Sequence, residues 1–379
     1  MRVLISCGGT GGHINPGLAI ADIIKTKYPD AEFLFAGTPK GMEAKLVPQA
    51  GYKLETIKVA GFQRKISLEN IGRNAKAVVY LATSGKRAKE IISGFKPDIA
   101  IGTGGYAAGP VIRKAARMGI PTAIHEQNAY PGVTNRLLSK EVDHVMLTVK
   151  EALDFMDKSR FEYSVTGLPV RSSINHMSRA EARKKLGIND DFTILSFGGS
   201  LGAGCINETM TEAIKWHTGR KLNINHIHGY GGMGKDTFPQ AMKAAGIPLK
   251  SDRLRITEYI NDMDVCLAAA DLVICRSGAS TLAELEAAGK ASVLIPSPIV
   301  AGNHQYHNAM VLGKAGAAEV IEQKDVTPEK IISIIEKLYN DPDRVEIMSR
   351  SAAELHLKDT DQRIMAVIED LLAKSSEKK

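Results

Sequence analysis

The first residues that could do chemistry form a glycine-rich loop, Ser6-Cys7-Gly8-Gly9-Thr10-Gly11-Gly12-His13-Ile14-Asn15-Pro16. The apolar run Val3–Ile5 before it is typical of a buried strand, and apolar residues recur at helical spacing from Leu18 to Ile24. Asn15 could cap that helix, and Pro16 fits its first turn. Glycines allow a ligand to approach the backbone closely, and free amides at a helix N-terminus favour phosphate. We therefore expect a phosphate-binding loop.

His13 stands at the end of this loop. An imidazole gains and loses a proton near neutral pH, so His13 is a candidate general base. It could equally brace the loop through a hydrogen bond, because geometry decides which role a histidine can take.

The loop differs from the dinucleotide-binding pattern. That pattern is G-x-G-x-x-G with an acidic residue about 20 residues on, at the end of the next strand. Here the spacing is G-G-T-G-G-H, and Glu32 begins the strand-like run Glu32–Ala36. A nicotinamide-dependent oxidoreductase is therefore disfavoured.

Similar glycine turns recur along the chain. Ser196-Phe197-Gly198-Gly199-Ser200-Leu201-Gly202 echoes the first loop, and Gly102–Tyr106 and Arg276–Thr281 also follow strand-like runs. Loops that follow parallel strands share one edge of a sheet, which is the ligand edge. Several such loops suit a nucleotide-diphosphate donor and a second phosphorylated partner.

Strand-like runs alternate with helix-like segments, which predicts an α/β protein with parallel sheets. The expected strands are Arg2–Ser6, Glu32–Ala36, Leu54–Val59, Asp98–Gly102, Pro121–His125, His144–Thr148, Tyr163–Thr166, Thr193–Phe197, Asn223–His228, Leu254–Thr257, Leu272–Cys275, Ser292–Pro296 and Ala318–Ile321.

The length of 379 residues suggests two domains. The pattern restarts after Gly167–Arg171, where a proline makes a semi-rigid linker. We expect two Rossmann-like domains, 1–166 and 167–342. A last helix at about 343–374 should pack partly onto the first domain.

Composition limits the class of protein. The four cysteines (Cys7, Cys205, Cys266 and Cys275) lie far apart without C-x-x-C spacing, which favours a reducing cytosol over a disulfide framework or zinc site. We expect no signal peptide, because the first apolar run is short, and no membrane span, because apolar runs stay below about 18 residues.

Positive charge concentrates in the first half. The formal net charge is +7, and eight basic residues but one acidic residue, Glu69, lie between Lys58 and Lys89. This segment could be a solvated helix face or a surface that docks on anionic lipid. Nucleic acid is disfavoured, because aromatic residues make up 5% of the chain and no recognition module is evident.

Over nearly its whole length the sequence resembles the MurG family of glycosyltransferases. The motifs that carry the resemblance are Gly8–Pro16, Gly102–Pro110, His125-Glu126-Gln127-Asn128, Gly198–Gly202, Cys275–Glu284, Asn303-His304-Gln305 and Asn308-Ala309. The resemblance implies the GT-B fold, in which two Rossmann-like domains face a cleft. It implies inverting transfer of GlcNAc from UDP-GlcNAc to undecaprenyl-pyrophosphoryl-MurNAc-pentapeptide in peptidoglycan synthesis.

The resemblance also implies site residues. Donor-site positions are Thr10, Gly11, Gly12, Asn128, Arg171, Ser200, Ile260, Ala279, Ser280, Thr281, Leu282, Ala283, Glu284 and Gln305. Glu284 suits the ribose hydroxyls, Gln305 the sugar hydroxyls, and the backbone of Ile260 the uracil. The acceptor pyrophosphate would lie against Gly9, Gly104, Gly105 and Tyr106.

Two residues compete for the role of general base. His13 is the first choice, and Glu126 is the alternative as base or charge stabiliser. Glu126 could instead satisfy a backbone amide at the end of a strand. Asp262-Met263-Asp264 resembles a metal-binding D-x-D motif, but acidic residues at a helix start commonly cap it. We expect no required metal, because loop amides and helix N-termini can stabilise the departing UDP.

The implied partners are UDP-GlcNAc, the undecaprenyl-linked acceptor, anionic inner-leaflet lipids and other cell-wall synthesis or division proteins. The implied location is peripheral, at the cytoplasmic face of the bacterial cell membrane. Another UDP-sugar enzyme of the same architecture, such as an epimerase or glycolipid-forming transferase, is the alternative function.

Overall fold

Each half of the chain builds one parallel β-sheet. The computed structural model describes residues 1–59, 68–175, 177–199 and 201–377, and side chains are not described at 68–79, 81, 82, 172 and 175. Unit 1 comprises Met1–Pro169 and Asp359–Lys379, and unit 2 comprises Val170–Lys358. The domain boundary expected from the sequence, after residue 166, lies three residues before the division at Pro169.

The sheet of unit 1 has the strand order β3-β2-β1-β4-β5-β6-β7. Its strands are β1 (Arg2–Ser6), β2 (Glu32–Gly37), β3 (Lys53–Thr56), β4 (Ile99–Gly102), β5 (Thr122–Glu126), β6 (His144–Leu147) and β7 (Glu162–Val165). Every pairing between these strands is parallel.

The sheet of unit 2 repeats this plan with the order β10-β9-β8-β11-β12-β13. Its strands are β8 (Phe192–Phe197), β9 (Ile224–Gly229), β10 (Leu254–Thr257), β11 (Leu272–Cys275), β12 (Ala291–Leu294) and β13 (Ala318–Val320). These strands also pair in parallel. The expected strands are therefore confirmed, with the largest difference at β3, which ends three residues before the expected Val59.

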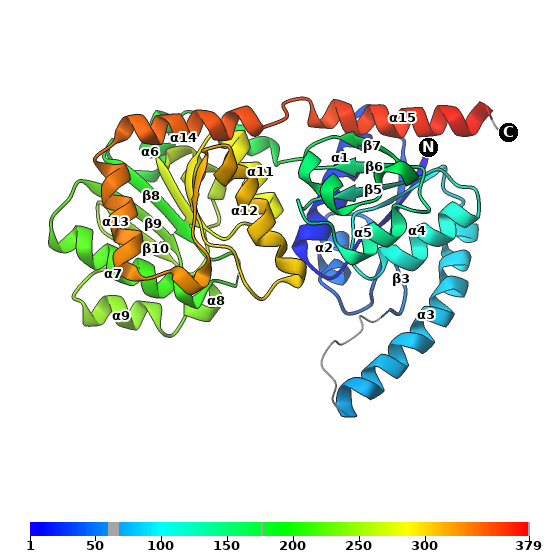
Figure 1. Ribbon diagram of the computed structural model, residues 1–379, viewed down its shortest axis with the longest axis horizontal. Helices are drawn as coiled ribbons and strands as arrows, with labels where there is room; N and C mark the ends of the chain where they lie inside the picture. Colours follow the sequence, from blue (N-terminus) through cyan, green and yellow to red (C-terminus); the bar gives the residue numbers. More distant parts are fainter. Residues whose placement is uncertain (60–67, 176, 200, 378–379) are drawn as a thin grey trace. The chain divides into compact units, whose positions relative to one another are not determined.

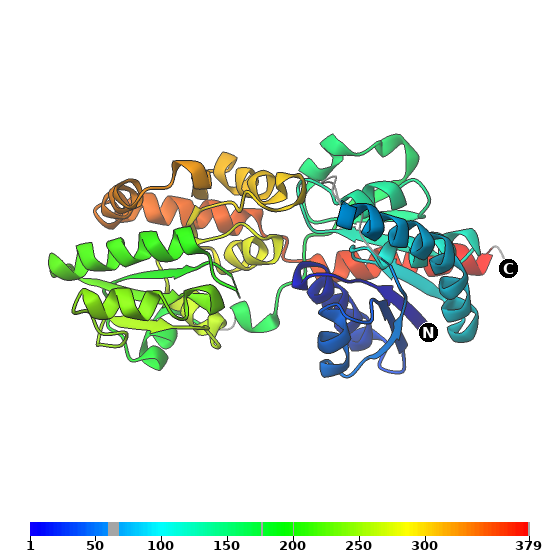
Figure 2. The same cartoon turned by 90° about the horizontal axis from the view of Figure 1, so that it is seen from below.

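Both faces of each sheet are buried under helices (Figures 1 and 2). In β1, Val3 and Ile5 pack into one core, and Leu4 between them packs into another. Side chains alternate across a strand, so a strand covered on both faces is apolar at every position. This explains the short continuous apolar runs of the sequence.

In unit 1, helices from distant parts of the chain share a face of the sheet. The helices are α1 (Gly11–Lys27), α2 (Glu43–Gln49), α3 (Leu68–Phe95), α4 (Ala108–Arg117), α5 (Val133–Leu138) and α15 (Thr360–Glu377). Residues of α1, α2 and α15 pack in one core with Val3 and Ile5. Residues of α3, α4 and α5 pack in the other core with Leu4.

In unit 2, the described helices also divide between the two faces. They are α6 (Arg179–Leu186), α7 (Gly204–Gly219), α8 (Gly231–Gly234), α9 (Phe238–Ala244), α10 (Met263–Ala269), α11 (Ala279–Ala288), α12 (His304–Lys314), α13 (Pro328–Tyr339) and α14 (Pro342–Leu355). One core takes residues of α7, α9 and α13, and the other takes residues of α10, α11 and α12.

Two helix predictions were wrong. The single helix expected at about 343–374 is two helices: α14 ends where His356 turns to an extended backbone (φ −70°, ψ 122°), and α15 starts at Thr360. The helix after the first glycine loop begins at Gly11 rather than after Asn15. Its N-cap is Thr10, and Pro16 lies inside the helix, because Gly11 and Gly12 themselves adopt the helical conformation.

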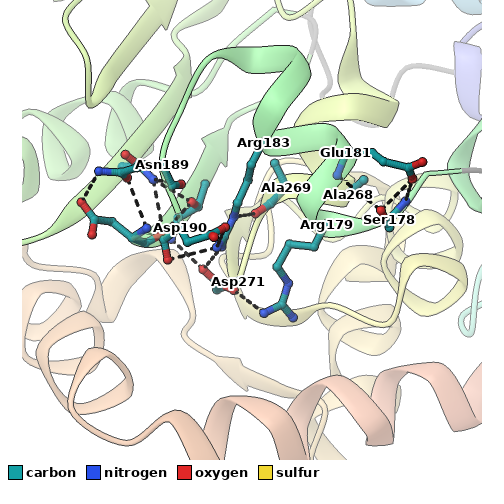
Figure 3. A network of polar contacts seen from close by, with 12 residues as sticks. Ser178, Arg179, Glu181, Arg183, Asn189, Asp190, Ala268, Ala269 and Asp271 are labelled. Atoms are coloured by element: carbon teal, nitrogen blue, oxygen red, sulfur yellow. Dashed lines mark hydrogen bonds and ion pairs between the residues drawn. The ribbon is translucent and has the colours of Figure 1, made fainter.

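A buried ion pair fastens α6 to the sheet of unit 2 (Figure 3). Arg183 donates from Nη2 to Asp271 Oδ2 at 2.6 Å and from Nε to the carbonyl of Ala269 at 3.3 Å. The same Asp271 oxygen accepts the backbone N–H of Thr193 at 2.7 Å, and Arg179 lies 3.0 Å from Oδ1. These contacts join the start of β8 and the residue before β11 to α6.

The strand order reverses direction once in each sheet, between β1 and β4 and between β8 and β11. Ligands of open α/β sheets bind outside the carboxyl ends of the strands at such a point. The four glycine turns found in the sequence follow these four strands. The topology thus places two of them together in each unit.

Candidate active site

The first glycine loop of unit 1 needs glycine for two separate reasons. Gly9 has φ +91°, a conformation that side chains with a Cβ rarely adopt. A Cβ on Gly8 would lie 2.6 Å from Oε1 of Glu43, which is too close for any real contact. The backbone of the loop therefore lies directly against a buried carboxylate.

Glu43, the first residue of α2, holds this loop in place. Its Oε2 accepts the N–H of Gly9 at 3.0 Å, and its Oε1 accepts the N–H and the hydroxyl of Thr38 at 2.8 and 2.6 Å. Burial raises the pKa of Glu43, but these hydrogen bonds outweigh it, so the pKa is lowered. Glu43 is thus a fixed anion that orients the loop backbone.

The second glycine loop of unit 1 packs against the first. Gly105 has φ +84°, and a Cβ there would overlap the carbonyl of Gly8. Gly104 has φ +106°, and its Cβ would lie 2.7 Å from Nδ1 of His13. The structure brings together the predicted acceptor positions Gly9, Gly104 and Gly105, and the neighbouring Tyr106 is 62% exposed.

His13 is half-buried in the first turn of α1, and the segments after β4 and β5 contact it. Its Nδ1 lies 3.1 Å from Oε1 of Gln127, and its carbonyl accepts the hydroxyl of Thr103 at 2.7 Å. Gln127 follows β5 and Thr103 follows β4, so the switch point of the sheet holds the histidine.

Glu126, the competing candidate base, is buried at the end of β5. Its Oε1 accepts the N–H and the Nδ2 of Asn128 at 2.9 and 3.1 Å. Its Oε2 accepts the N–H of Gly132 at 3.0 Å and Nδ2 of Asn135 at 2.8 Å. Four hydrogen bonds occupy the carboxylate, so it organises the 128–135 segment.

The glycine loop of unit 2 repeats the geometry of the first. Gly199 has φ +91°, the value found at Gly9, and a Cβ on Gly198 would overlap the backbone N of Ala203. Gly202 (φ +82°) lies against the carbonyl of Tyr230. The predicted donor residue Ser200 lies outside the described residues, and Leu201 beside it is 72% exposed.

The turn into α11 presents backbone donors. Gly278 is the N-cap, and the first intrahelical bond runs from Leu282 N to its carbonyl at 3.0 Å. The amides of Ala279, Ser280 and Thr281 precede that bond, so they have no partner within the helix. Leu282 and Ala283, also predicted for the donor site, point their side chains into the core. A ligand could reach them through the backbone alone.

Glu284 and Arg171, which the sequence predicts separately for the donor site, form an ion pair. Arg171 donates from Nε and Nη2 to Oε1 of Glu284 at 3.1 and 2.9 Å. Burial raises the pKa of Glu284, and the guanidinium of Arg171 opposes this shift. The two side chains therefore position each other at one edge of unit 2.

Gln305 and Ile260 complete the predicted set in unit 2. The Oε1 of Gln305 accepts the N–H of Ser297 at 2.9 Å, which leaves its amide NH₂ as the donating group. Ile260 is buried, and its side chain packs against Gly229, so its backbone is the part suited to a ligand. The predicted donor positions Thr10, Gly11, Gly12 and Asn128 lie in unit 1.

Asp262 stands at the N-cap of α10 but does not cap it through its side chain, contrary to the prediction. Arg255 binds its carboxylate through two hydrogen bonds of 2.9 and 2.8 Å, an arrangement stronger than a single contact to a backbone N–H. Within the described part of the chain, no three His, Cys, Asp or Glu side chains are grouped to hold a metal ion.

Two family models match the chain. The glycosyltransferase family 28 N-terminal domain matches residues 3–147, and the family 28 C-terminal domain matches residues 193–364. A relative from Acetivibrio thermocellus is 46% identical over 98% of this chain and 98% of its own. It is named UDP-N-acetylglucosamine--N-acetylmuramyl-(pentapeptide) pyrophosphoryl-undecaprenol N-acetylglucosamine transferase. The chain belongs to the MurG family.

Other comparisons agree with this assignment. A relative of the same name from Desulforamulus reducens is 42% identical over 98% of this chain and 99% of its own. The crystal structure of Acinetobacter baumannii MurG matches with a TM-score of 0.78 and 28% identity, over 97% of this chain and 99% of that one. The two parallel-sheet units are thus those of the GT-B fold, and this member of the MurG family is a hexosyltransferase.

Sequence reasoning missed two residues that hold the first glycine loop and His13 in place. Gln127 belongs to the His125–Asn128 motif, but the sequence predicted no role for it, although it contacts His13. Glu43 carried no signal, because a glutamate in a short helix usually faces water. A Cβ on any of three glycines (Gly8, Gly37 and Gly41) would clash with Glu43. These glycines are spread over 34 residues, so their shared contact with Glu43 is visible only in the folded structure.

Proposed function

We propose that this protein transfers GlcNAc from UDP-GlcNAc to undecaprenyl-pyrophosphoryl-MurNAc-pentapeptide, a step of peptidoglycan synthesis. The observation that carries the proposal is the 46% identity, over nearly the full length, to a relative named for this reaction. The two pairs of glycine turns at the switch points of the sheets support it, because the reaction needs sites for two diphosphate-bearing substrates.

Unit 2 provides the donor site in this proposal. Glu284 accepts hydrogen bonds from the ribose hydroxyls and Arg171 holds its carboxylate in place. The backbone at Ile260 contacts uracil, and the NH₂ of Gln305 donates to a hydroxyl of the sugar. The amides at the start of α11, which have no partner within the helix, face the diphosphate.

Unit 1 provides the acceptor site. The Gly8–Gly12 and Gly104–Gly105 loops bind the acceptor pyrophosphate, and His13 removes the proton from the acceptor hydroxyl. The hydroxyl oxygen then forms a bond to the anomeric carbon as the bond to the UDP oxygen breaks, so one displacement inverts the configuration. The electron pair leaves with UDP, and amides at helix N-termini stabilise its charge without a metal.

His13 and Glu126 can be separated by experiment. Glu126→Gln places an NH₂ group among four donors, so it should lower the thermal stability of the protein together with its activity. His13→Gln should abolish transfer while the melting temperature stays within a few degrees. Full activity of His13→Gln would exclude it as the base.

We also propose that the basic segment between Lys58 and Lys89 docks on anionic lipid at the cytoplasmic face of the membrane, where the enzyme would meet cell-wall synthesis and division proteins. Residues 60–67 and the side chain of Arg73 lie outside the described residues. None of the described helices has the length and apolar character of a membrane span. Charge reversal at Arg64, Lys65 and Arg73 should reduce binding to anionic liposomes and leave UDP affinity unchanged. Equal liposome binding by the variant would refute this role.

The deciding experiment is transfer of labelled GlcNAc from UDP-GlcNAc to a lipid-linked MurNAc-pentapeptide in detergent, with and without EDTA. We expect GlcNAc transfer in both assays, and loss of transfer in the assay with EDTA would overturn the metal-free part of the proposal. Binding of UDP-GlcNAc without any transfer would refute the acceptor assignment and favour another UDP-sugar enzyme.

A further inference from the structure

We propose that Gln127 sets the tautomer of His13 and is therefore a positioning residue for the transfer reaction. The inference rests on the proposed function, because it assumes that His13 acts as the base. Its foundation is a chain of hydrogen bonds in unit 1 that runs from His13 through Gln127 and His125 to the carbonyl of Gly167.

The direction of the chain is fixed at its far end. Nε2 of His125 lies 2.9 Å from the carbonyl oxygen of Gly167, and a carbonyl can accept but never donate. Nε2 of His125 therefore carries the hydrogen. His125 is fully buried, and burial lowers its pKa, although the Gly167 contact and Glu126 oppose this. A neutral His125 with its hydrogen on Nε2 has a lone pair on Nδ1.

The orientation of the Gln127 amide follows. Its Nε2 lies 2.8 Å from the carbonyl of His125 and 3.2 Å from Nδ1 of the same residue, and both of these are acceptors. An amide flipped by 180° would place its oxygen against that carbonyl and that lone pair. The NH₂ group must therefore face His125, which leaves Oε1 facing His13.

The orientation of the Gln127 amide determines the tautomer of His13. Its Nδ1 lies 3.1 Å from Oε1 of Gln127, which can only accept, so Nδ1 carries the hydrogen. Nε2 then carries the lone pair. The carbonyl of His13 is fixed by Thr103, and Gly104 leaves the space that the ring occupies. The chain therefore supplies a base whose acceptor nitrogen is chosen before the substrate arrives.

The same contact supports the reaction after proton transfer. When Nε2 takes the proton of the acceptor hydroxyl, Nδ1–H keeps its bond to the amide oxygen of Gln127, and the oxygen dipole faces the new positive charge. Gln127 thus acts as the third group that orients a base, a role often held by a carboxylate. A neutral amide performs it without adding a charge beside the acceptor pyrophosphate.

The first test needs the unmodified full-length protein. Long-range ¹H–¹⁵N correlation spectra of histidine-labelled protein at pH 8 distinguish the two tautomers of each neutral ring, and the spectrum of His13→Gln identifies the signals of His13. We expect His13 in the Nδ1–H form and His125 in the Nε2–H form. A dominant Nε2–H form of His13 would overturn the proposal.

The second test removes the acceptor oxygen. In Gln127→Met, we expect the His13 signals to become a mixture of tautomers and kcat to fall by about 10- to 100-fold, part of the roughly 100- to 10,000-fold that a general base contributes. The KM for UDP-GlcNAc should stay within about twofold, because unit 2 binds most of the donor. Gln362→Met, the same exchange at an exposed position of α15, should change neither quantity.

The outcomes separate this inference from the proposed function. An unchanged tautomer and unchanged kcat in Gln127→Met would refute the inference while transfer by the wild type persists. The expected tautomers in a wild-type protein that transfers no GlcNAc would instead refute the proposed function. If Gln127→Met fails to fold, the wild-type spectrum still decides.

Discussion

A chain of three buried histidines next to the glycine loop of unit 2 should make this unit sensitive to acid. Nε2 of His217 lies 3.1 Å from Nδ1 of His226, whose Nε2 lies 2.9 Å from Oγ of Ser196. The same hydroxyl lies 2.8 Å from Nδ1 of His228. Ser196 precedes the Gly198–Gly202 loop by two residues, so protonation of this chain would act directly below the proposed donor site.

The sign of the effect follows from the pKa values. Burial lowers the pKa of His217 to about 4 and that of His228 to about 3, and burial together with the neighbouring His217 and His228 lowers the pKa of His226 well below its ordinary value. In the unfolded chain all three have the ordinary value of 6.5. The stability contributed by the neutral rings is therefore present above pH 6.5 and is lost as the pH falls from 6.5 toward 4.

The magnitude follows from proton linkage. Each histidine that is protonated only in the unfolded state lowers the free energy of unfolding by about 1.4 kcal/mol per pH unit. Three of them give about 3 kcal/mol between pH 6.5 and 5.5 and up to about 4 kcal/mol for the next unit. His356 in the same unit, whose pKa is also lowered by burial, adds to this slope, and Glu284, whose pKa burial raises, opposes it where that carboxyl takes up its proton.

The chain contains its own probe of unit 2. Its single tryptophan, Trp216, precedes His217 and packs against the core under that face of the sheet. Urea unfolding followed by Trp216 fluorescence between pH 7.5 and 5 therefore gives the free energy of unfolding of this unit against pH. His217→Gln can still hydrogen-bond His226 but cannot take up a proton in this range.

The slope of the free energy of unfolding against pH should differ between the wild type and His217→Gln by the equivalent of one proton. We expect the slope for His217→Gln to be smaller than the wild-type slope by about 1.4 kcal/mol per pH unit near pH 5.5, whatever the variant does to stability at pH 7.5. Equal slopes would refute the reasoning, since they would mean that His217 is protonated in the folded unit as easily as in the unfolded chain.

Other predictions concern the scaffold of the site. Glu43→Gln should raise the KM for the lipid acceptor and lower unit 1 stability by about 1.5–3 kcal/mol, the value of a charge-assisted hydrogen bond. The same exchange at the exposed Glu377 should change neither quantity. Urea unfolding followed by hydrogen exchange of residues 1–27 measures the stability of unit 1. Gly105→Ala should lower unit 1 stability by at least about 1–2 kcal/mol in the same assay, because its φ is +84°. Arg183→Met should lower unit 2 stability by about 1.5–3 kcal/mol in the Trp216 assay, since buried Asp271 loses a charge-assisted hydrogen bond but keeps Arg179 and the N–H of Thr193; a change under about 0.5 kcal/mol would contradict this.

The architecture could be predicted because its signals are local. Strands buried on both faces give continuous apolar runs, and each glycine turn marks the end of a strand by its composition. The repeated Gly8-Gly9 and Gly198-Gly199 pairs indicated two related units, and their second glycines do share a φ of +91°. Helix boundaries were less predictable, because glycines such as Gly11 fit both a loop and a helix.

The division of labour within the site could not be read from the sequence, because it depends on hydrogen-bonding capacity. Glu126 and His13 both suit proton transfer by residue type. The fold presents four donors to Glu126 and a single acceptor to Nδ1 of His13. A carboxylate with four partners loses hydrogen bonds when it accepts a proton, whereas an imidazole bonded through one nitrogen keeps the other for chemistry. Partners such as Gln127, 114 residues away from His13, therefore distinguish two candidates that residue type alone does not separate.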